Sequence, residues 1–177
     1  MVAVDRLQPV AAGAAEDERE KQYATILTRI EALLEGEADW VTAMSTVAAE
    51  LHSAFEYYHW TGFYRTVEPQ LLKLGPYQGG TACILIPFSR GVCGAAAREA
   101  ATQLVTDVHA FPGHIACASS TQSEVVVPVM DRDGKHCVAV LDVDSDLPAA
   151  FTAADAAGLE QICAWLQRQD WSPRYYP

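Results

Sequence analysis

The sequence has little positive charge and no long apolar run. Its 12 lysines and arginines stand against 23 aspartates and glutamates, which gives a net charge of −11. Nucleic acids and anionic membranes both bind basic patches, so this balance argues against either as a partner. No apolar run reaches the roughly 20 residues that a membrane-spanning helix needs. Because Asp5 and Arg6 interrupt any signal-peptide core, we expect a cytoplasmic protein.

A C-x-x-C pair is also missing, although the chain has five cysteines. Cytoplasmic thiols are reduced at rest and five is an odd number, so catalytic or core roles are favoured over permanent bridges. A zinc site built from Cys93, His109, His114 and Cys117 is a weaker alternative, because their spacing matches no compact zinc knuckle. We therefore expect neither a metal ion nor a cofactor.

The composition is otherwise that of one globular domain, with 177 residues of which 50% are apolar. Residues 1–15 show no periodicity and are predicted to form a flexible arm before a domain that covers 16–177. Apolar residues at helical spacing predict helices from Glu16 and from Asp39, and Asp39 is suited to cap the second one. Thr152 is suited to cap a closing helix in the same way.

Between these helices the apolar period changes to two, which predicts a largely antiparallel sheet. A loop over 109–122 has no period, and loops of this length are often functional. The fold class is therefore α+β, with a central antiparallel sheet and packed terminal helices. The expected strands cover residues 57–66, 71–75, 82–88, 102–108, 124–130 and 136–144.

Acidic residues stand on the last two of these strands. Asp142 and Asp144 are two residues apart, so both point to one face of the sheet, where Glu124 could join them. Repulsion within such a cluster raises at least one carboxyl pKa, which lets that acid donate a proton near neutral pH. The cluster would also attract an ammonium group. The alternative is a solvated sheet face without a chemical role.

The position of Glu124 depends on the turn between the two strands. A two-residue turn at 133–134 would put Glu124 on the opposite face from the aspartates. A three-residue loop over 132–134, with its glycine in the left-handed conformation, would set Glu124 directly opposite Asp142, and we favour this loop. A bulge at Pro128 could also correct the register.

Local sequence features only partly distinguish core cysteines from reactive ones. Cys137 and Cys163 occupy apolar strand and helix positions and are predicted to be small core residues. Cys93 lies near a helix start, where the dipole lowers a thiol pKa, and Cys117 follows His114, whose imidazolium would favour a thiolate. These features rank Cys93 and Cys117 equally.

Cys83 begins an apolar strand, so a core position is the default expectation for it. The glycines before it could, however, let a loop carry its thiol toward a partner. Thiols that lie close to a cluster of acids suit redox chemistry on a small polar substrate better than they suit packing.

Four segments, in this order, resemble the free methionine-R-sulfoxide reductases, which are built on a GAF domain. They are GPYQGGTACILIPFSRGVCGAAA, LVTDVHAFPGHIAC, SEVVVPV and LDVDS. The resemblance runs from about Trp60 through the last helix, and its motifs are long and specific. One position departs from the pattern, because Ala118 stands where the family usually has an acidic residue.

The resemblance implies a GAF-like fold, with helices packed on one side of the sheet and loops closing a pocket on the other. It implies that Cys117 is the nucleophile, that Cys83 resolves the intermediate from a mobile loop, and that Cys93 has a lesser or relaying role.

The resemblance also implies how the pocket holds its substrate. Glu124, Asp142 and Asp144 match the acids that bind the sulfoxide and ammonium end. Trp60 and Tyr64 match the aromatic part of the pocket, where sulfur–aromatic contact would hold the S-methyl group.

The implied reaction reduces free L-methionine-(R)-S-oxide to methionine. An acid of raised pKa would protonate the sulfoxide oxygen while the Cys117 thiolate attacks sulfur. Methionine would leave, and the cysteine would become a sulfenic acid. Cys83 would condense with it to a disulfide, which thioredoxin would reduce.

Free methionine sulfoxide and thioredoxin are thus the expected partners, and the apolar first helix leaves a homodimer open. A non-enzymatic GAF module that senses a small molecule or oxidation is the alternative function. A thiol switch without a substrate pocket is another, but it would give no role to the acids and Trp60.

Overall fold

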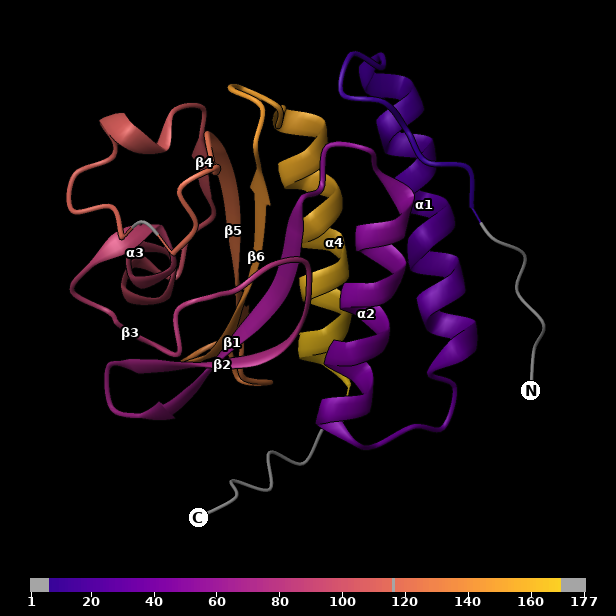
Figure 1. Cartoon of the computed structure of the whole chain (residues 1–177). Helices are drawn as coiled ribbons and strands as arrows, with labels where there is room; N and C mark the ends of the chain where they lie inside the picture. Colours follow the sequence, from indigo (N-terminus) through magenta and orange to yellow (C-terminus); the bar gives the residue numbers. More distant parts are fainter. Residues whose placement is uncertain (1–6, 116, 170–177) are drawn as a thin grey trace.

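The computed structural model describes residues 7–115 and 117–169, which form a sheet with a layer on each face (Figure 1). Helices α1 (Glu16–Leu33), α2 (Trp40–Ala54) and α4 (Ala153–Arg168) cover one face. The short helix α3 (Gly91–Glu99) and the loops around it cover the other face. This is the α+β arrangement that the sequence predicts.

Neighbouring strands of the sheet run antiparallel, in the order β3-β2-β1-β6-β5-β4. The central position of β1, β6 and β5 means that their side chains are covered on both faces, whereas β3 and β4 form the edges. The strands are β1 (Trp60–Glu68), β2 (Leu71–Gln78), β3 (Leu85–Pro87), β4 (Gln103–Val105), β5 (Ser123–Met130) and β6 (Cys137–Ser145).

Every predicted strand is present, but several ends differ. The first strand begins at Trp60 rather than at residue 57, and the tyrosines before it belong to the helical side. Tyr58 hydrogen-bonds the hydroxyl of Tyr23 in α1 and belongs to the helical core cluster, whereas Trp60 belongs to the cluster on the other face. The residues between β2 and β3 are irregular, which confines β3 to Leu85–Pro87.

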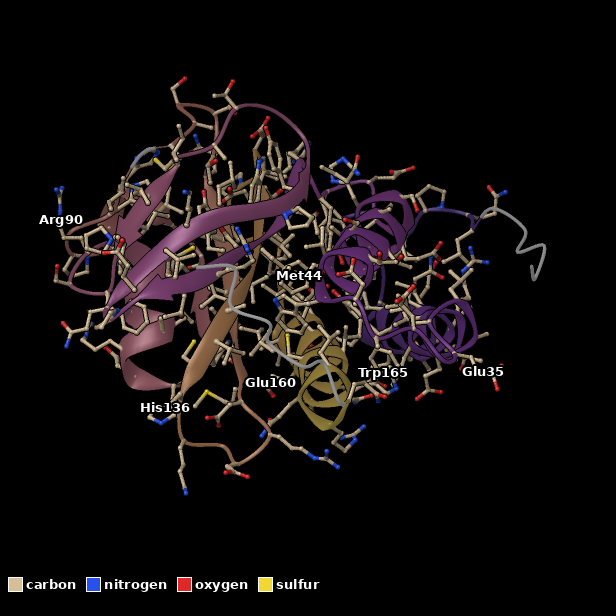
Figure 2. All side chains as sticks on the ribbon, turned by 90° about the horizontal axis from the view of Figure 1, so that it is seen from below. Glu35, Met44, Arg90, His136, Glu160 and Trp165 are labelled. Atoms are coloured by element: carbon tan, nitrogen blue, oxygen red, sulfur yellow. A yellow bond between two sulfur atoms is a disulfide. The ribbon has the colours of Figure 1, made fainter. Side chains whose placement is uncertain are left out.

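Alternation along β5 and β6 divides the core into two clusters. The residues that face the helices are apolar and fully buried, for example Val125, Val127 and Leu141. In Figure 2 Met44 of α2 lies between this face and the helices, and it is also fully buried. Since successive side chains of a strand point to opposite faces, the acids at 124, 142 and 144 face α3 and the loops.

The helix starts behave as the sequence predicts. Asp39 caps α2 by accepting from the backbone N–H of Thr42 at 2.9 Å. Thr152 and Asp155 form a capping box at the start of α4.

Asp155 also belongs to a buried polar network that the sequence did not reveal. Its carboxylate pairs with Arg19 of α1 and accepts from the hydroxyls of Tyr23 (2.8 Å) and Tyr57 (2.6 Å). Arg19 donates further to the backbone oxygens of Ala12 and Ala150. The network therefore ties the N-terminal segment, α1, α4 and the approach to β1 together.

Part of the segment expected to be a flexible arm packs on the domain. Val10 is buried, its N–H donates to the oxygen of Ala54, and its oxygen accepts from Glu56, both at 2.9 Å. Residues 1–6 lie outside the described residues. The predicted domain boundary at residue 16 therefore leaves out residues that contact the core.

The turn between β5 and β6 differs from the favoured loop. Asp131 pairs with His136 through a 2.7 Å backbone hydrogen bond, and a bulge lies between Val129 and Met130. The longer turn and the bulge each shift the register by one residue, so Glu124 is opposite Asp144 and not Asp142. The sequence allowed a bulge at Pro128 of β5, whereas the extra residue is Val138 of β6, between Cys137 and Ala139.

The described helices include none that is both long enough and apolar enough to cross a membrane.

Candidate active site

A pocket lies on the α3 side of the sheet. Its floor comes from β1, β5 and β6, one wall comes from α3, and the segments on either side of α3 close it. The predicted site residues that line it are Trp60, Tyr64, Cys93, Cys117, Glu124, Asp142 and Asp144.

Strand pairing brings the floor residues together. Trp60 of β1 is opposite Asp144 of β6, which is opposite Glu124 of β5. Asp142 lies one row along the same face, opposite Gly62. Three acids from two strands therefore share one face, as the sequence predicts, and an indole stands beside them.

Burial and mutual repulsion change the acidity of this cluster. Burial raises the pKa of Glu124 well above its ordinary value, and the nearby Asp142 and Asp144 raise it further. Burial also raises the pKa of Asp144 and takes that of Asp142 to about 7. The cluster therefore holds protons near neutral pH, and a carboxylic acid here can act as a proton donor.

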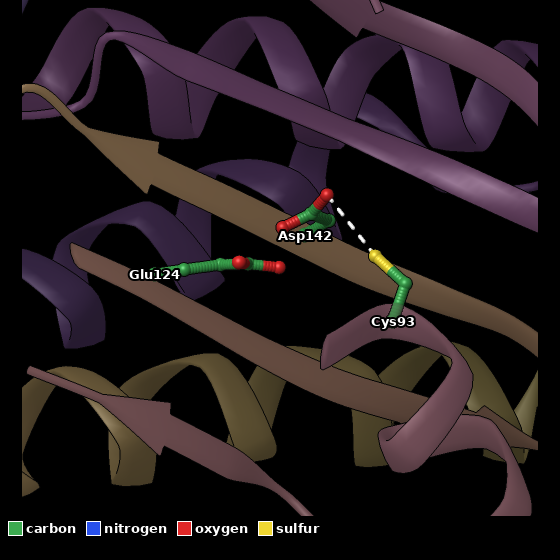
Figure 3. A group of neighbouring side chains, drawn as sticks. All are labelled: Cys93, Glu124 and Asp142. Carbon is green, nitrogen blue, oxygen red and sulfur yellow. Dashed lines mark hydrogen bonds between the residues drawn. The ribbon is translucent and has the colours of Figure 1, made fainter. Parts of the chain in front are cut away.

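Cys93 contacts this cluster directly (Figure 3). Its Sγ–H donates to Oδ2 of Asp142 across 3.2 Å. Burial and the charge of Asp142 raise the pKa of the Cys93 thiol. The expectation that the start of α3 lowers this pKa is wrong, because Cys93 is buried against acids instead of facing solvent.

The same three side chains are the only described group with the composition of a small metal site. Ligand atoms of Cys93, Glu124 and Asp142 lie within 4.8 Å of one another. A metal bound here would have to displace the protons that the Cys93 thiol and Glu124 hold because of their raised pKa values. The alternative zinc set is not assembled either, since Cys117 is bonded to another cysteine.

That other cysteine is Cys83. The two form a disulfide that links positions 34 residues apart, with Cα atoms 5.2 Å from each other. Cys117 lies in the segment between β4 and β5, and Cys83 lies between β2 and β3, so the bridge joins the segments that close the pocket. Cys93, Cys137 and Cys163 are free and buried.

Aromatic rings form the side wall. Trp60 stacks between Tyr64 and Tyr77, with ring centroids 5.8 and 5.3 Å away. Gly62 makes room for this stack, because a Cβ there would lie 2.6 Å from the Trp60 ring. The Nε1 of Trp60 and Oδ1 of Asp142 are buried without a hydrogen-bond partner among the described residues.

His114 lines the pocket near the bridge, as its position in the sequence suggests. Burial lowers the pKa of its imidazole, and the neighbouring His109 lowers it further. The ring is therefore neutral near pH 7, and the expected imidazolium that would favour a Cys117 thiolate is not supported.

Several lining residues carried no sequence signal. Gly62 supports the Trp60 ring without itself lining the pocket, and it differs from other strand glycines only through this contact, which depends on packing. The remaining lining residues that we did not select are Thr81, Ala82, Ile86, Gly91, Val92, Ile115, Ala118 and Thr121. Most lie inside the motifs quoted above, so the resemblance was the only signal that could have found them.

Comparison with known proteins agrees with this geometry. A structure described as that of the GAF domain superposes with a TM-score of 0.79 and 35% identity, covering 89% of this chain and 90% of that one. The fold and the pocket on one sheet face thus define a GAF-domain protein. No model of a protein family matches the chain.

Related proteins assign the chain to one family within the GAF-domain class. The free methionine-R-sulfoxide reductase of Escherichia coli (strain K12) is 38% identical over 82% of this chain and 87% of its own length. The crystal structure of the corresponding Neisseria meningitidis enzyme, in complex with its substrate, has a TM-score of 0.82 and 39% identity over 93% and 94% of the two chains. The chain belongs to the free methionine-R-sulfoxide reductase family.

Proposed function

We propose that this chain reduces free L-methionine-(R)-S-oxide to methionine. The observation that carries the proposal is the Cys83–Cys117 disulfide beside a pocket floored by three acids. A reducible sulfur pair and a proton source are the two things that removal of a sulfoxide oxygen requires. The relatives named above, one of them solved with its substrate, support the same activity.

The acid cluster supplies the proton. The sulfoxide oxygen must gain a proton before it passes to the attacking cysteine sulfur as a hydroxyl group, and burial beside Asp142 raises the pKa of Glu124 so that Glu124 holds such a proton. Burial also raises the pKa of Asp142, to about 7, and that of Asp144, because three acids this close cannot all ionise. Cys93 remains a thiol and holds Asp142 in place through its hydrogen bond.

The thiols supply the electrons. The Cys117 thiolate attacks the sulfoxide sulfur, methionine leaves, and Cys117 becomes a sulfenic acid. The Cys83 thiol then attacks that sulfur and releases water, which yields the bridge seen in the structure. Thioredoxin reduces the bridge by thiol–disulfide exchange and restores both thiols.

The polar atoms of the pocket suit a zwitterionic amino acid. Oδ1 of Asp142 is a buried acceptor without a partner, and an ammonium group would satisfy it. Nε1 of Trp60 is a buried donor without a partner, and a substrate oxygen would satisfy it. Trp60 and Tyr64 then contact the S-methyl group.

Variants of the two bridge cysteines test the proposal. Cys117→Ser should abolish turnover of free methionine-R-sulfoxide. Cys83→Ser should release about one equivalent of methionine per chain and then stop in a thioredoxin-coupled assay, since its sulfenic acid has no partner. Methionine is quantified by amino-acid analysis.

Cys163→Ser is the matched control, because Cys163 is free and buried in the helical layer away from the pocket. It should keep the wild-type rate. Full activity of Cys117→Ser would refute the proposal. Parallel assays with the free S epimer and with a peptide-bound sulfoxide should give little turnover.

The non-enzymatic sensor is less well supported. One solved relative is described as a putative GAF sensor protein, with 38% identity. A module that senses a small molecule has no need of a disulfide, and a module that senses oxidation has no need of protonated acids in a pocket, whereas the reductase uses both. The homodimer and the cytoplasmic location stay predictions.

A further inference from the structure

An exposed apolar surface adjoins the disulfide and has no part in the reaction described above. Ile84 and Leu85 directly follow Cys83, and their exposed fractions are 66% and 52%. No other large apolar residue among the described ones is as exposed. Single exposed apolar side chains are ordinary, but two adjacent ones beside a reactive disulfide indicate a contact surface.

The backbone at this place is also open for pairing. β3 is an edge strand that pairs with β2 on one side. The oxygen of Ile84 accepts from Leu74 at 3.0 Å, so Ile84 directs its backbone groups toward β2. In an antiparallel strand, the backbone N–H and C=O of successive residues point toward opposite sides of the strand. Leu85 therefore directs its N–H and C=O toward the outer edge.

The two sulfur atoms differ in position. Cys117 is among the described residues that line the pocket, and Cys83 is not. Cys83 lies within about 7 Å of Leu85 along the chain, because consecutive Cα atoms are about 3.8 Å apart. A protein reductant that covers Leu85 thus reaches Cys83 without entering the pocket.

We infer that Ile84, Leu85 and the outer edge of β3 form the docking surface for the dithiol protein that reduces the bridge, and that this protein attacks Cys83. The inference rests on the proposed function, in which the bridge is reduced once per turnover. The reductant pairs with the outward backbone groups of Leu85, since Pro87 has no N–H and its oxygen accepts from Arg90, and it contacts the side chains of Ile84 and Leu85.

The bridge is reduced in two thiol–disulfide exchange steps. A reductant thiolate attacks Sγ of Cys83, the S–S bond breaks, and Cys117 leaves as a thiolate that takes a proton from water. The second thiol of the reductant loses its proton and attacks the mixed disulfide, which releases Cys83. The reductant is oxidised to its disulfide, and this chain gains two electrons and two protons.

Reduction kinetics of the oxidised chain test the surface. The double variant Ile84→Ser/Leu85→Ser should show about a tenfold loss in the second-order rate of reduction by thioredoxin, since two apolar contacts are lost. Its reduction by dithiothreitol, which needs no docking, should match wild type. Leu104→Ser is the control, because Leu104 is 41% exposed on β4 at the opposite edge.

An unchanged rate with thioredoxin would overturn the inference. So would an equal loss with Leu104→Ser, or an equal loss with dithiothreitol, which would mean that the substitutions alter the bridge itself.

A trapping experiment tests the point of attack. Thioredoxin whose second active-site cysteine is replaced by serine should stay bound as a mixed disulfide, and peptide mass spectrometry should find it on Cys83. A bond to Cys117 would refute this part. Both experiments follow disulfide reduction without methionine sulfoxide, so they remain informative if the chain fails to turn that substrate over.

Discussion

At the scale of residues, Asp142 shows how the pocket opposes the stability of the fold. Burial raises its carboxyl pKa from 3.8 to about 7. Between these two pH values the folded chain binds a proton that the unfolded chain has released. Stability therefore falls as the pH rises through this window, the opposite of the behaviour of a salt-bridged aspartate.

Asp142→Asn should remove this penalty. We expect the variant to gain stability over wild type between about pH 4 and pH 8, by on the order of 2 kcal/mol, while it loses activity. Urea unfolding of both reduced proteins at several pH values measures the difference. Glu35→Gln, at an exposed position, is the control. A difference that stays constant or shrinks as the pH rises would contradict the assigned cause.

Other residues of the site show which local signals can be trusted. The alternation rule placed Asp142 and Asp144 on one face because it depends only on strand geometry. The helix-start rule failed for Cys93, since the three-dimensional neighbours of a buried thiol outweigh the dipole of its own helix. Burial likewise outweighed the sequence proximity of His114 to Cys117.

At the scale of elements, the contribution of β1 to the pocket depends on Gly62, which lies opposite Asp142. Gly62 pairs with Asp142 and packs under the ring of Trp60. A Cβ at this position would lie 2.3 Å from Cβ of Tyr77, a backbone-anchored atom that cannot swing away. The glycine thus lets the indole lie flat along the pocket wall.

Gly62→Ala should therefore displace Trp60. We expect a KM for methionine sulfoxide raised about tenfold, with a loss of about 1–3 kcal/mol in unfolding free energy from overpacking. Gly13→Ala is the matched control, because nothing lies within 4 Å of its added Cβ. Steady-state kinetics and urea unfolding measure the effects. Wild-type kinetics in Gly62→Ala would show that the stack does not shape the pocket.

In the β5–β6 hairpin the strands could be predicted from the sequence, but their register could not. The sequence located both strands and a turn containing Gly134, whose φ is +68°. It did not locate the bulge at Val138 of β6, which together with the longer turn moved Glu124 from Asp142 to Asp144. Several bulge positions satisfy the same alternation, and packing between the two layers selects one.

At the scale of the whole molecule, the buried pair of Arg19 and Asp155 holds the helical layer together. Both side chains are almost fully buried, and they join α1 to α4 across 136 positions. This network lies on the helical face, and the pocket lies on the other. The buried ion pair therefore lies in the layer of α1, α2 and α4, and the pocket lies in the layer of α3 and its flanking loops.

Asp155→Asn should destabilise the fold by about 3–5 kcal/mol, because it leaves the Arg19 charge buried without its partner. The rate per folded molecule should stay near wild type. Asp17→Asn, which breaks the exposed pair with Lys21, is the control and should have little effect. Urea unfolding and activity at low denaturant measure both. Equal stability of the two variants would contradict the assigned role.

The sequence by itself determined the α+β class, the helix caps, and the common face of Asp142 and Asp144. These depend on periodicity and on contacts within a few residues, so they can be read along the chain. Only the tertiary structure decided that Cys93 contacts Asp142, that Asp155 contacts Arg19, and that the acids line a pocket beside the Cys83–Cys117 bridge. Those contacts join distant segments, and the closure of the sheet and its layers sets their geometry.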